Sequence, residues 1–293
     1  MNRGTREGQG NRTSTVLGRR LGGELQKLRA KAGKTQLQAA HELSATTTKV
    51  TKMESGWVPM RDPDIRVLCQ FYGATDADVV NGLLDLARLD RDRRKAKGWW
   101  QQMPIVGGLG EYIAMEEVAT RIRTWQPALV PGLLQTPEYI RALGVTSNWS
   151  HPDEIEALVT TRTKRQGRLW GDQPLEFHAV LWEAVLRQQV GGPDVMRAQL
   201  NHLVEMAQLP HVHVQVLPFR AGPYPGANGA FNIVSFSEPG ALEVGYAEAI
   251  GSTLWAEGVE ANAAYTRAFA QVSQRSLAPH DSVNLIDAIS KGM

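Results

Sequence analysis

The sequence predicts an α+β protein, in which an all-α N-terminal domain precedes a mixed domain with a small, mainly antiparallel sheet. Two observations lead to this class. Apolar residues recur every three or four positions through residues 16–97, which is the spacing of helices packed on a core. After residue 99, short segments that alternate apolar and polar residues lie between further helical segments. Helices before and after a small sheet are typical of an α+β fold.

Length and composition limit the class of protein. A chain of 293 residues is long enough for two domains. Its 42% hydrophobic and 21% charged residues exclude a collagen-like, disordered or coiled-coil chain for the bulk. No apolar run approaches the ~20 residues of a membrane span, and the N-terminus lacks the apolar segment of an export signal, so we expect a cytoplasmic protein without membrane contact. Cys69, the single cysteine, has no partner for an intrachain disulfide.

Charge is distributed unevenly along the chain. Residues 1–98 hold 19 Lys and Arg against 11 Asp and Glu, a net charge of +8, and residues 99–293 hold 13 against 19, a net charge of −6. Residues 1–15 are expected to form a disordered basic tail. A basic N-terminal half suits a polyanion such as nucleic acid, although ordinary solvated charge would give the same count.

Five helices are predicted within residues 16–97. The first carries a leucine stripe and ends at Gly33, the second starts at the capping box 35–38, and the third starts after the N-cap Thr46. The fourth follows an N-cap at Asp62, and the fifth follows Asp76. The end of the fifth helix, 88–98, is strongly polar and is expected to be an exposed helix end that runs into a linker near Gly98.

The second domain, 99–293, is predicted to alternate helices and strands. We expect helices at 111–123, 137–143, 152–169, 191–206, 257–276 and 280–290, and strands at 175–183, 211–219, 231–236 and 241–248. The last two strands are separated by residues 238–240, a predicted hairpin turn. The segment 125–139 is rich in Pro and Gly but strongly apolar, so we expect a loop folded into the domain.

The segment 35–54 has the spacing of a helix-turn-helix, two short helices joined by a tight turn. Its third helix exposes small donors, acceptors and cations, with no carboxylate before Glu54, so it can enter a major groove without repelling phosphate. Gln36 begins the preceding helix, where backbone N–H groups can meet a phosphate. A five-helix domain used only for protein contacts is the alternative.

The residues LGGELQKLRAKAGKTQLQAAHELSATTTKVTKMESGWVP resemble the phage-repressor-like helix-turn-helix family, the XRE or Cro/C1 type. The resemblance implies DNA contacts at Gln36, Thr47, Thr48, Thr51 and Lys52, with Lys49 and Ser55 beside the DNA backbone. The sequence departs from the family pattern at Ala45, where a larger aliphatic residue is common, and in its run of three threonines, which leaves the base preference open.

The second domain lacks the strong catalytic motifs: the phosphate-binding glycine loops, the serine nucleophile elbow and the HExxH zinc motif. We therefore expect no enzyme and no cofactor. His211 and His213, two apart on a predicted strand, share a face on which two imidazoles could hold a metal. No Cys, Asp or Glu lies at ligand spacing nearby, so a polar strand face without metal is the expected reading.

The apolar loops of this domain carry a candidate patch for a basic small protein or an apolar effector. The alternative is that the same side chains close the domain core. The patch residues are Trp125, Leu129, Leu133, Tyr224 and Phe231.

Three blocks, 121–143, 190–219 and 221–236, look like the C-terminal DUF5753 or Scr1-type antitoxin-like domain found behind such helix-turn-helix modules in actinomycetes. This resemblance implies a sequence-specific transcriptional regulator that binds a promoter operator in double-stranded DNA, with a C-terminal domain that senses a partner or ligand. An antitoxin-like protein that sequesters a small basic companion and regulates its own gene is the alternative. A homodimer and a nucleoid-associated location are expected with either function, and an enzyme with a DNA-targeting module is a third possibility that the missing motifs disfavour.

Overall fold

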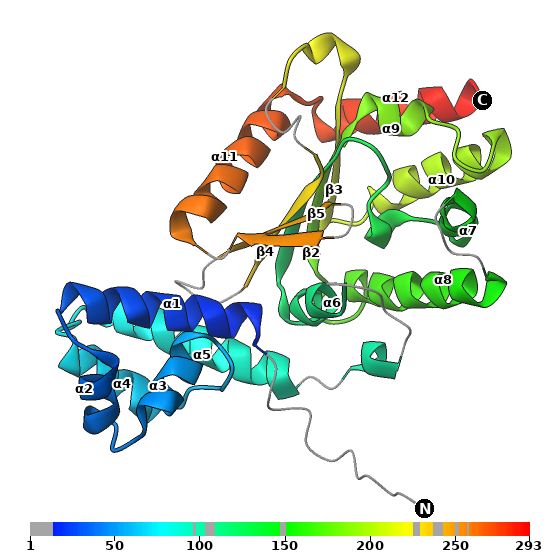
Figure 1. Cartoon of the computed structure of the whole chain (residues 1–293). Helices are drawn as coiled ribbons and strands as arrows, with labels where there is room; N and C mark the ends of the chain where they lie inside the picture. Colours follow the sequence, from blue (N-terminus) through cyan, green and yellow to red (C-terminus); the bar gives the residue numbers. More distant parts are fainter. Residues whose placement is uncertain are drawn as a thin grey trace, which may run out of the picture. The chain divides into compact units, whose positions relative to one another are not determined.

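The computed structural model describes residues 14–95, 98–102, 109–146, 151–224, 229–236, 243–249, 252–256 and 258–293. The chain forms two compact units (Figure 1). The first consists chiefly of the residues up to Gly98, and the second of Trp99–Ser235, Glu243–Ala256 and Glu260–Met293. No helix in the described ranges combines the length and apolar character needed to cross a membrane.

The first unit contains the five predicted helices: α1 (Val16–Lys31), α2 (Gln36–Glu42), α3 (Thr47–Glu54), α4 (Asp62–Phe71) and α5 (Ala77–Lys95). Side-chain caps explain two of the boundaries. Thr35 and Gln38 form a complete capping box at the start of α2, and Thr46 accepts a hydrogen bond from the Lys49 amide at the start of α3. The core takes apolar side chains from all five helices: Leu17, Leu21, Ala39, Val50, Met53, Ile65, Leu68 and Leu83.

The two ends of this unit differ from the prediction. Thr15, assigned to the tail, is the N-cap of α1 and is buried; residues 1–13 of that tail lie outside the described residues. The C-terminal end of α5 is exposed only in part, because Arg88, Asp92 and Lys95 are exposed whereas Leu89 and Asp90 are buried. Asp90 pairs with Arg94 at 2.8 Å. The ion pair between Asp90 and Arg94 is therefore buried, although the sequence around it is strongly polar.

A six-stranded mixed sheet is the centre of the second unit. Its strands are β1 (Arg121–Gln126), β2 (Glu176–Trp182), β3 (Val212–Leu217), β4 (Phe231–Ser235), β5 (Val244–Ala249) and β6 (Ser252–Ala256), in the order β3-β2-β1-β4-β5-β6. β2 runs parallel to both β1 and β3, and the other three pairings are antiparallel, which confirms a mainly antiparallel sheet.

Helices cover both faces of this sheet (Figure 1). On one face lie α6 (Leu109–Val118), α8 (Pro152–Gln166) and α10 (Pro193–Met206), and on the other lies α11 (Val259–Arg275), whose Phe269 and Val272 pack on Trp125. α12 (Pro279–Lys291) packs on β3 and α10. The remaining elements are α7 (Pro137–Thr146), α9 (Glu183–Arg187) and short 3-10 turns at Trp99–Gln102, Gly132–Leu134 (η3), Gly167–Leu169 and Phe219–Ala221.

Three elements of the second unit differ from the prediction. Residues 121–123, expected to end a helix, belong to β1, residues 252–256 form a strand that was not expected, and Glu183–Arg187 form the unexpected helix α9. In β1, Ile122 and Thr124 point to one face of the sheet. The segment is a strand rather than a helix because β2 and β4 pair with it on both edges. The predicted hairpin turn at 238–240 lies outside the described residues.

Candidate nucleic-acid interface

The residues expected to contact DNA lie together on the surface formed by α3 and the start of α2. Thr48, Thr51 and Lys52 are exposed, and Gln36, Thr47, Lys49 and Ser55 are half-buried. Trp57 also belongs to this surface: it is 47% exposed and lines a shallow hollow together with residues 47, 48, 51, 52 and 55. Sequence reasoning missed Trp57, although an aromatic residue directly after the Gly that ends the helix was visible.

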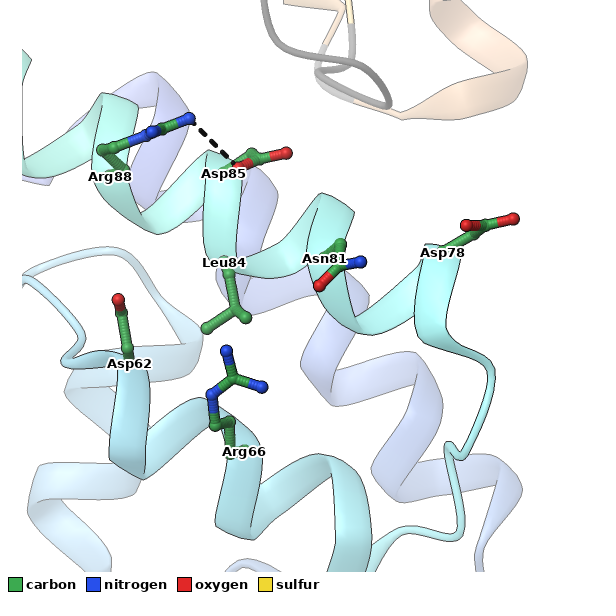
Figure 2. Close-up of a pocket in the computed structure, with 7 residues that line it drawn as sticks. All are labelled: Asp62, Arg66, Asp78, Asn81, Leu84, Asp85 and Arg88. Carbon is green, nitrogen blue, oxygen red and sulfur yellow. Dashed lines mark hydrogen bonds and ion pairs between the residues drawn. The ribbon is translucent and has the colours of Figure 1, made fainter.

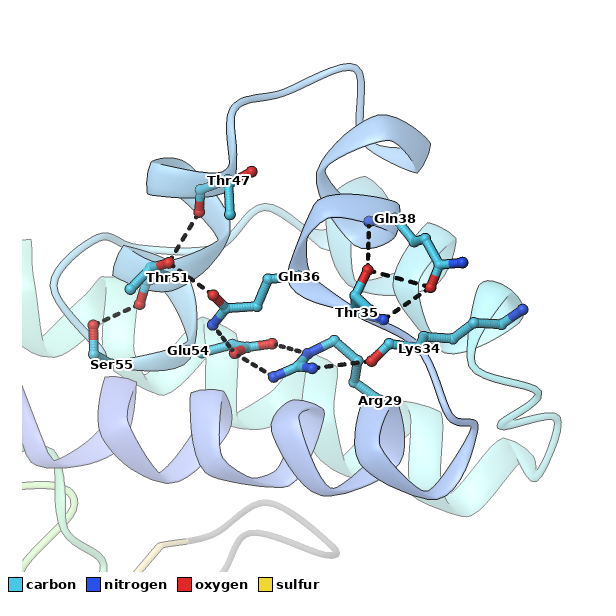
Figure 3. A network of polar contacts seen from close by, with 9 residues as sticks. All are labelled: Arg29, Lys34, Thr35, Gln36, Gln38, Thr47, Thr51, Glu54 and Ser55. Carbon is cyan, nitrogen blue, oxygen red and sulfur yellow. Dashed lines mark hydrogen bonds and ion pairs between the residues drawn. The ribbon is translucent and has the colours of Figure 1, made fainter.

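Gln36 is held at the centre of a hydrogen-bond network (Figure 3). Its Nε2 donates to Glu54 Oε2 at 2.7 Å, and its Oε1 accepts from Thr51 Oγ1 at 3.1 Å. The Thr51 hydroxyl can instead donate to the Thr47 carbonyl at 3.0 Å. The two bonds to Gln36 fix the orientation of its amide, with the oxygen toward Thr51 and the nitrogen toward Glu54, both residues of α3.

Glu54, the carboxylate at the end of α3, points toward Arg29 and away from the surface expected to contact DNA (Figure 3). Arg29 of α1 donates to it twice, through Nε at 2.6 Å and Nη2 at 2.9 Å, and this bond raises the pKa of Arg29. Arg29 Nη1 also donates to the Lys34 carbonyl at 3.0 Å. Because the carboxylate is paired inside the domain, it adds little negative charge to the surface that we expect to face phosphates.

The two lysines of α3 differ in their surroundings. Lys49 Nζ lies 3.5 Å from Asp64 Oδ2, an oxygen that also accepts from Arg61 Nε at 3.2 Å. Lys52 makes no ion pair with any of the described residues, and its side chain is exposed. Of the two, Lys52 is therefore the freer to meet a phosphate.

α1 supports α3 by unusually close packing. A Cβ at Gly22 would lie 2.2 Å from the Glu54 carbonyl oxygen, so only glycine permits this approach. At the other end of the contact, Arg94 Nη2 donates to the Gly56 carbonyl at 2.6 Å and to Thr15 Oγ1 at 3.0 Å. The turn that ends α3 is thus held by residues from both ends of the first unit.

A second hollow of this unit lies between α4 and α5 (Figure 2). Arg66 projects into it from α4, and Asp85 and Arg88 of α5 form an ion pair at 3.2 Å beside it. Three carboxylates and two guanidinium groups line it: Asp62, Asp78, Asp85, Arg66 and Arg88. With more negative than positive groups, this hollow is poorly suited to phosphate.

In the second unit, the five residues of the expected patch do not form one surface. Trp125 and Phe231 are buried on the sheet face covered by α11, where Tyr224 packs edge-on against Trp125 with ring centroids 5.2 Å apart. Leu129 and buried Leu133 lie elsewhere, on the wall of a cavity over the opposite face of the sheet. Leu129 and Leu133 belong to the loop after β1, which passes over the other face of the sheet, and this separates the two groups.

His211 and His213 have separate partners. His211 Nε2 lies 2.9 Å from the Leu169 carbonyl oxygen, whereas His213 packs against His178 with ring centroids 5.9 Å apart. Within the described ranges, no three His, Cys, Asp or Glu side chains come together as a metal site. His178 in turn contacts Gln215 Oε1 through Nε2 at 2.7 Å. These contacts account for the two histidines as parts of the packed sheet.

Comparison with known families finds two matches. A helix-turn-helix domain family matches residues 20–81, and a domain of unknown function, DUF5753, matches residues 109–288. Neither the curated proteins nor the solved structures include a match to this chain. The first match supports a DNA-binding regulator, and it includes every residue assigned to the candidate interface.

Proposed function

Because this chain belongs to the DUF5753 family and carries a helix-turn-helix domain, we propose that it is a sequence-specific transcriptional regulator whose second unit senses a ligand or a partner. It acts by binding an operator in double-stranded DNA, in the cytoplasm where the nucleoid lies, and catalyses no reaction.

One observation carries this proposal: the exposed surface of α3 presents hydroxyl and ammonium groups, while its carboxylate is paired inward. Thr48 and Thr51 can donate to and accept from base edges, and Lys52 can neutralise a phosphate. The ion pair with Arg29 neutralises Glu54, the one negatively charged residue of α3, which would otherwise repel the DNA phosphates.

We further propose that the regulator binds DNA as a homodimer. A single helix in the major groove contacts only a few base pairs, which is too little for a unique genomic address. Two copies related by a two-fold axis would read half-sites about one helical turn, ~10 base pairs, apart or a multiple of that. Footprinting combined with light scattering tests this: a monomer on one asymmetric half-site would contradict it.

The test of function is a selection of bound fragments from the source genome with the full-length chain, repeated with Thr48→Ala and Lys52→Ala. Thr48→Ala should alter the base preference at one or more positions. The discrimination between bases lost there should be ~1–3 kcal/mol. Lys52→Ala should weaken binding to all sequences alike. Thr163→Ala, an exposed threonine of α8 in the second unit, is the matched control and should select the wild-type sequence.

The proposal fails if the wild-type chain enriches no sequence, or if both α3 variants bind as the control does. Purification from cells adds a separate outcome. A small basic protein recovered in stoichiometric amount, without which the operator is not regulated, would identify the second unit's partner as a protein rather than a ligand.

A further inference from the structure

The second unit contains a cavity of about 320 Å³ over the sheet face opposite α11. Its volume is at the lower end of the range for small-molecule pockets. Polar and apolar groups share its wall. The apolar part comes from four elements: Tyr112 of α6, Leu129 and Leu133 of the loop after β1, Leu158 of α8 and Phe177 of β2. All of the lining residues belong to the second unit, so the cavity is complete within it.

The loop 127–136, which forms one side of this cavity, is fixed by buried hydrogen bonds. Gln135 Nε2 donates to the Val130 carbonyl at 2.6 Å, and the Tyr139 hydroxyl accepts from the Val130 amide at 3.3 Å. Gln199 of α10 donates to the Leu134 carbonyl at 2.7 Å. These bonds fix the wall through the protein's own groups, so ligand binding requires little ordering of the loop.

Two arginines of α8, one turn apart, reach the cavity, and their charges are balanced differently. Arg165 forms a bidentate pair with Glu116 of α6, both bonds being 2.9 Å long, and the side chains are 9% and 1% exposed. Arg162 makes no ion pair with a described residue; Nη1 donates to the neutral amide oxygen of Gln135. Among the described residues, no carboxylate therefore forms an ion pair with Arg162, and Glu248 at the same cavity acts on it without direct contact.

The surroundings of Arg162 disfavour its charged form. Burial lowers the pKa of Arg162 to about 10, with neighbouring Arg165 adding to the effect and Glu248 opposing it. A partly desolvated guanidinium that donates only to an amide is stabilised strongly by an anion that completes its planar fork of donors.

The remaining polar groups limit the charge of that anion. Glu248 of β5 lies at the cavity and accepts from the Tyr246 hydroxyl at 2.6 Å. Its carboxylate would repel a second negative charge, which disfavours phosphates and dicarboxylates. Asn232 of β4, whose side chain makes no hydrogen bond with a described residue, can donate to a neutral polar group of a ligand.

From this arrangement we propose that the cavity binds a small apolar monocarboxylate, whose carboxylate pairs with Arg162 and whose apolar body contacts the leucine and aromatic wall. The assignment rests on the proposed function, because it gives the chemical class of the ligand that the second unit senses.

The test measures binding to the full-length chain in the absence of DNA, by ligand-observed NMR and calorimetry. The probes are octanoate and 3-phenylpropanoate, each paired with its primary amide, which keeps the apolar body and removes the charge. The protein is compared with Arg162→Gln, Arg162→Lys and the control Arg197→Gln, an exposed arginine of α10 paired with Asp194. Thermal unfolding verifies that each variant is folded.

At least one of the two carboxylates should bind the wild type and Arg197→Gln with equal affinity. Its affinity for Arg162→Gln should be at least tenfold lower. Arg162→Lys should fall between, because it keeps the charge and loses the planar fork. The amides should bind at least tenfold more weakly than the acids. Equal binding of acid and amide, unchanged binding to Arg162→Gln, or no binding of either acid overturns the proposal. DNA binding is measured separately without the probes, so a failure of the ligand proposal can be distinguished from a failure of the proposed function.

Discussion

Gln36 Nε2 donates to Glu54 Oε2 at 2.7 Å, so the first side chain of α2 is joined to the last side chain of α3. Glu54 is joined in turn to Arg29 of α1. Three helices of the first unit therefore meet at one carboxylate, directly behind the surface expected to face DNA. The relationship predicts that residues without DNA contact affect DNA binding.

Glu54→Gln should weaken DNA binding although Glu54 faces inward. The neutral amide loses the charge-assisted bonds from Arg29 and Gln36, so Gln36 is no longer oriented. The free energy of unfolding should fall by about 1–3 kcal/mol. Operator affinity and chemical denaturation measure the two effects, with Glu42→Gln on the exposed side of α2 as the control. Tighter DNA binding by Glu54→Gln would mean that its charge acts on the phosphates directly.

Lys52→Ala and Lys49→Ala should differ in their salt dependence. Loss of one phosphate contact reduces the slope of log affinity against log salt by about one. We expect that reduction for Lys52→Ala and a smaller one for Lys49→Ala, because Asp64 lies 3.5 Å from the Lys49 ammonium. Titrations of the operator at several salt concentrations measure it. A larger change for Lys49→Ala would show that its ion pair with Asp64 opens when DNA binds.

Gly22→Ala and Gly23→Ala should change stability in opposite directions. At Gly22 the added Cβ would lie 2.2 Å from the Glu54 carbonyl oxygen, so α1 and α3 must separate, at a cost of about 1–3 kcal/mol. At Gly23 nothing lies within 4 Å, and alanine should stabilise α1 by up to about 1 kcal/mol. Denaturation of both variants measures this. Equal stability of the two would contradict the close packing of α1 on Glu54.

The second unit should lose stability in mild acid through His178. Burial lowers the pKa of His178, Gln215 opposes this by hydrogen bonding, and His213 and Arg123 add to the lowering while Glu176 opposes it. Phe269 of α11 packs on the ring at 5.0 Å. A base with a lower pKa in the folded than in the unfolded chain stays neutral in the fold. The free energy of unfolding is therefore unaffected at pH 7.5 and falls once the pH passes below ~6.5, the value in the unfolded chain.

His178→Gln should lose less stability than the wild type between pH 7.5 and pH 5. His202, whose pKa burial also lowers, remains in both proteins and contributes equally. His280→Gln, an exposed histidine of α12, is the control and should behave as the wild type. Denaturation curves at a series of pH values provide the comparison, and parallel curves for His178→Gln and wild type would show that His178 is not the group responsible.

The first unit was predictable because its boundaries depend on local chemistry. Thr35 and Thr46 determine where α2 and α3 begin, Gly56 with its positive φ follows the end of α3, and these local signals act within a few residues. The inward pairing of Glu54 was not predictable, because it depends on Arg29, 25 residues away, lying across the end of α3.

In the second unit the outcome depended on distant partners. Residues 121–123 are a strand because β2 and β4 pair with them, and sequence spacing alone does not show this. The loop leucines and Trp125 were grouped by apolar character, but the loop after β1 carries its leucines over the sheet face opposite Trp125, which depends on tertiary packing. Arg162 and Glu248 gave no sequence signal, since each is one charged residue among many.

The central position of β1 has a consequence for how the chain folds. The Thr124 hydroxyl lies within hydrogen-bonding distance of the Phe231 carbonyl, 107 residues away, so the sheet cannot close until most of the second unit has been synthesised. Among its described residues the first unit contains only helices, whose backbone hydrogen bonds are local and form rapidly. During synthesis, the helix-turn-helix unit can therefore complete its structure while β1 still exposes the edge that β4 will occupy. An unpaired strand edge is prone to aggregate, so we expect truncations before residue 231 to yield a folded first unit joined to an aggregating second one.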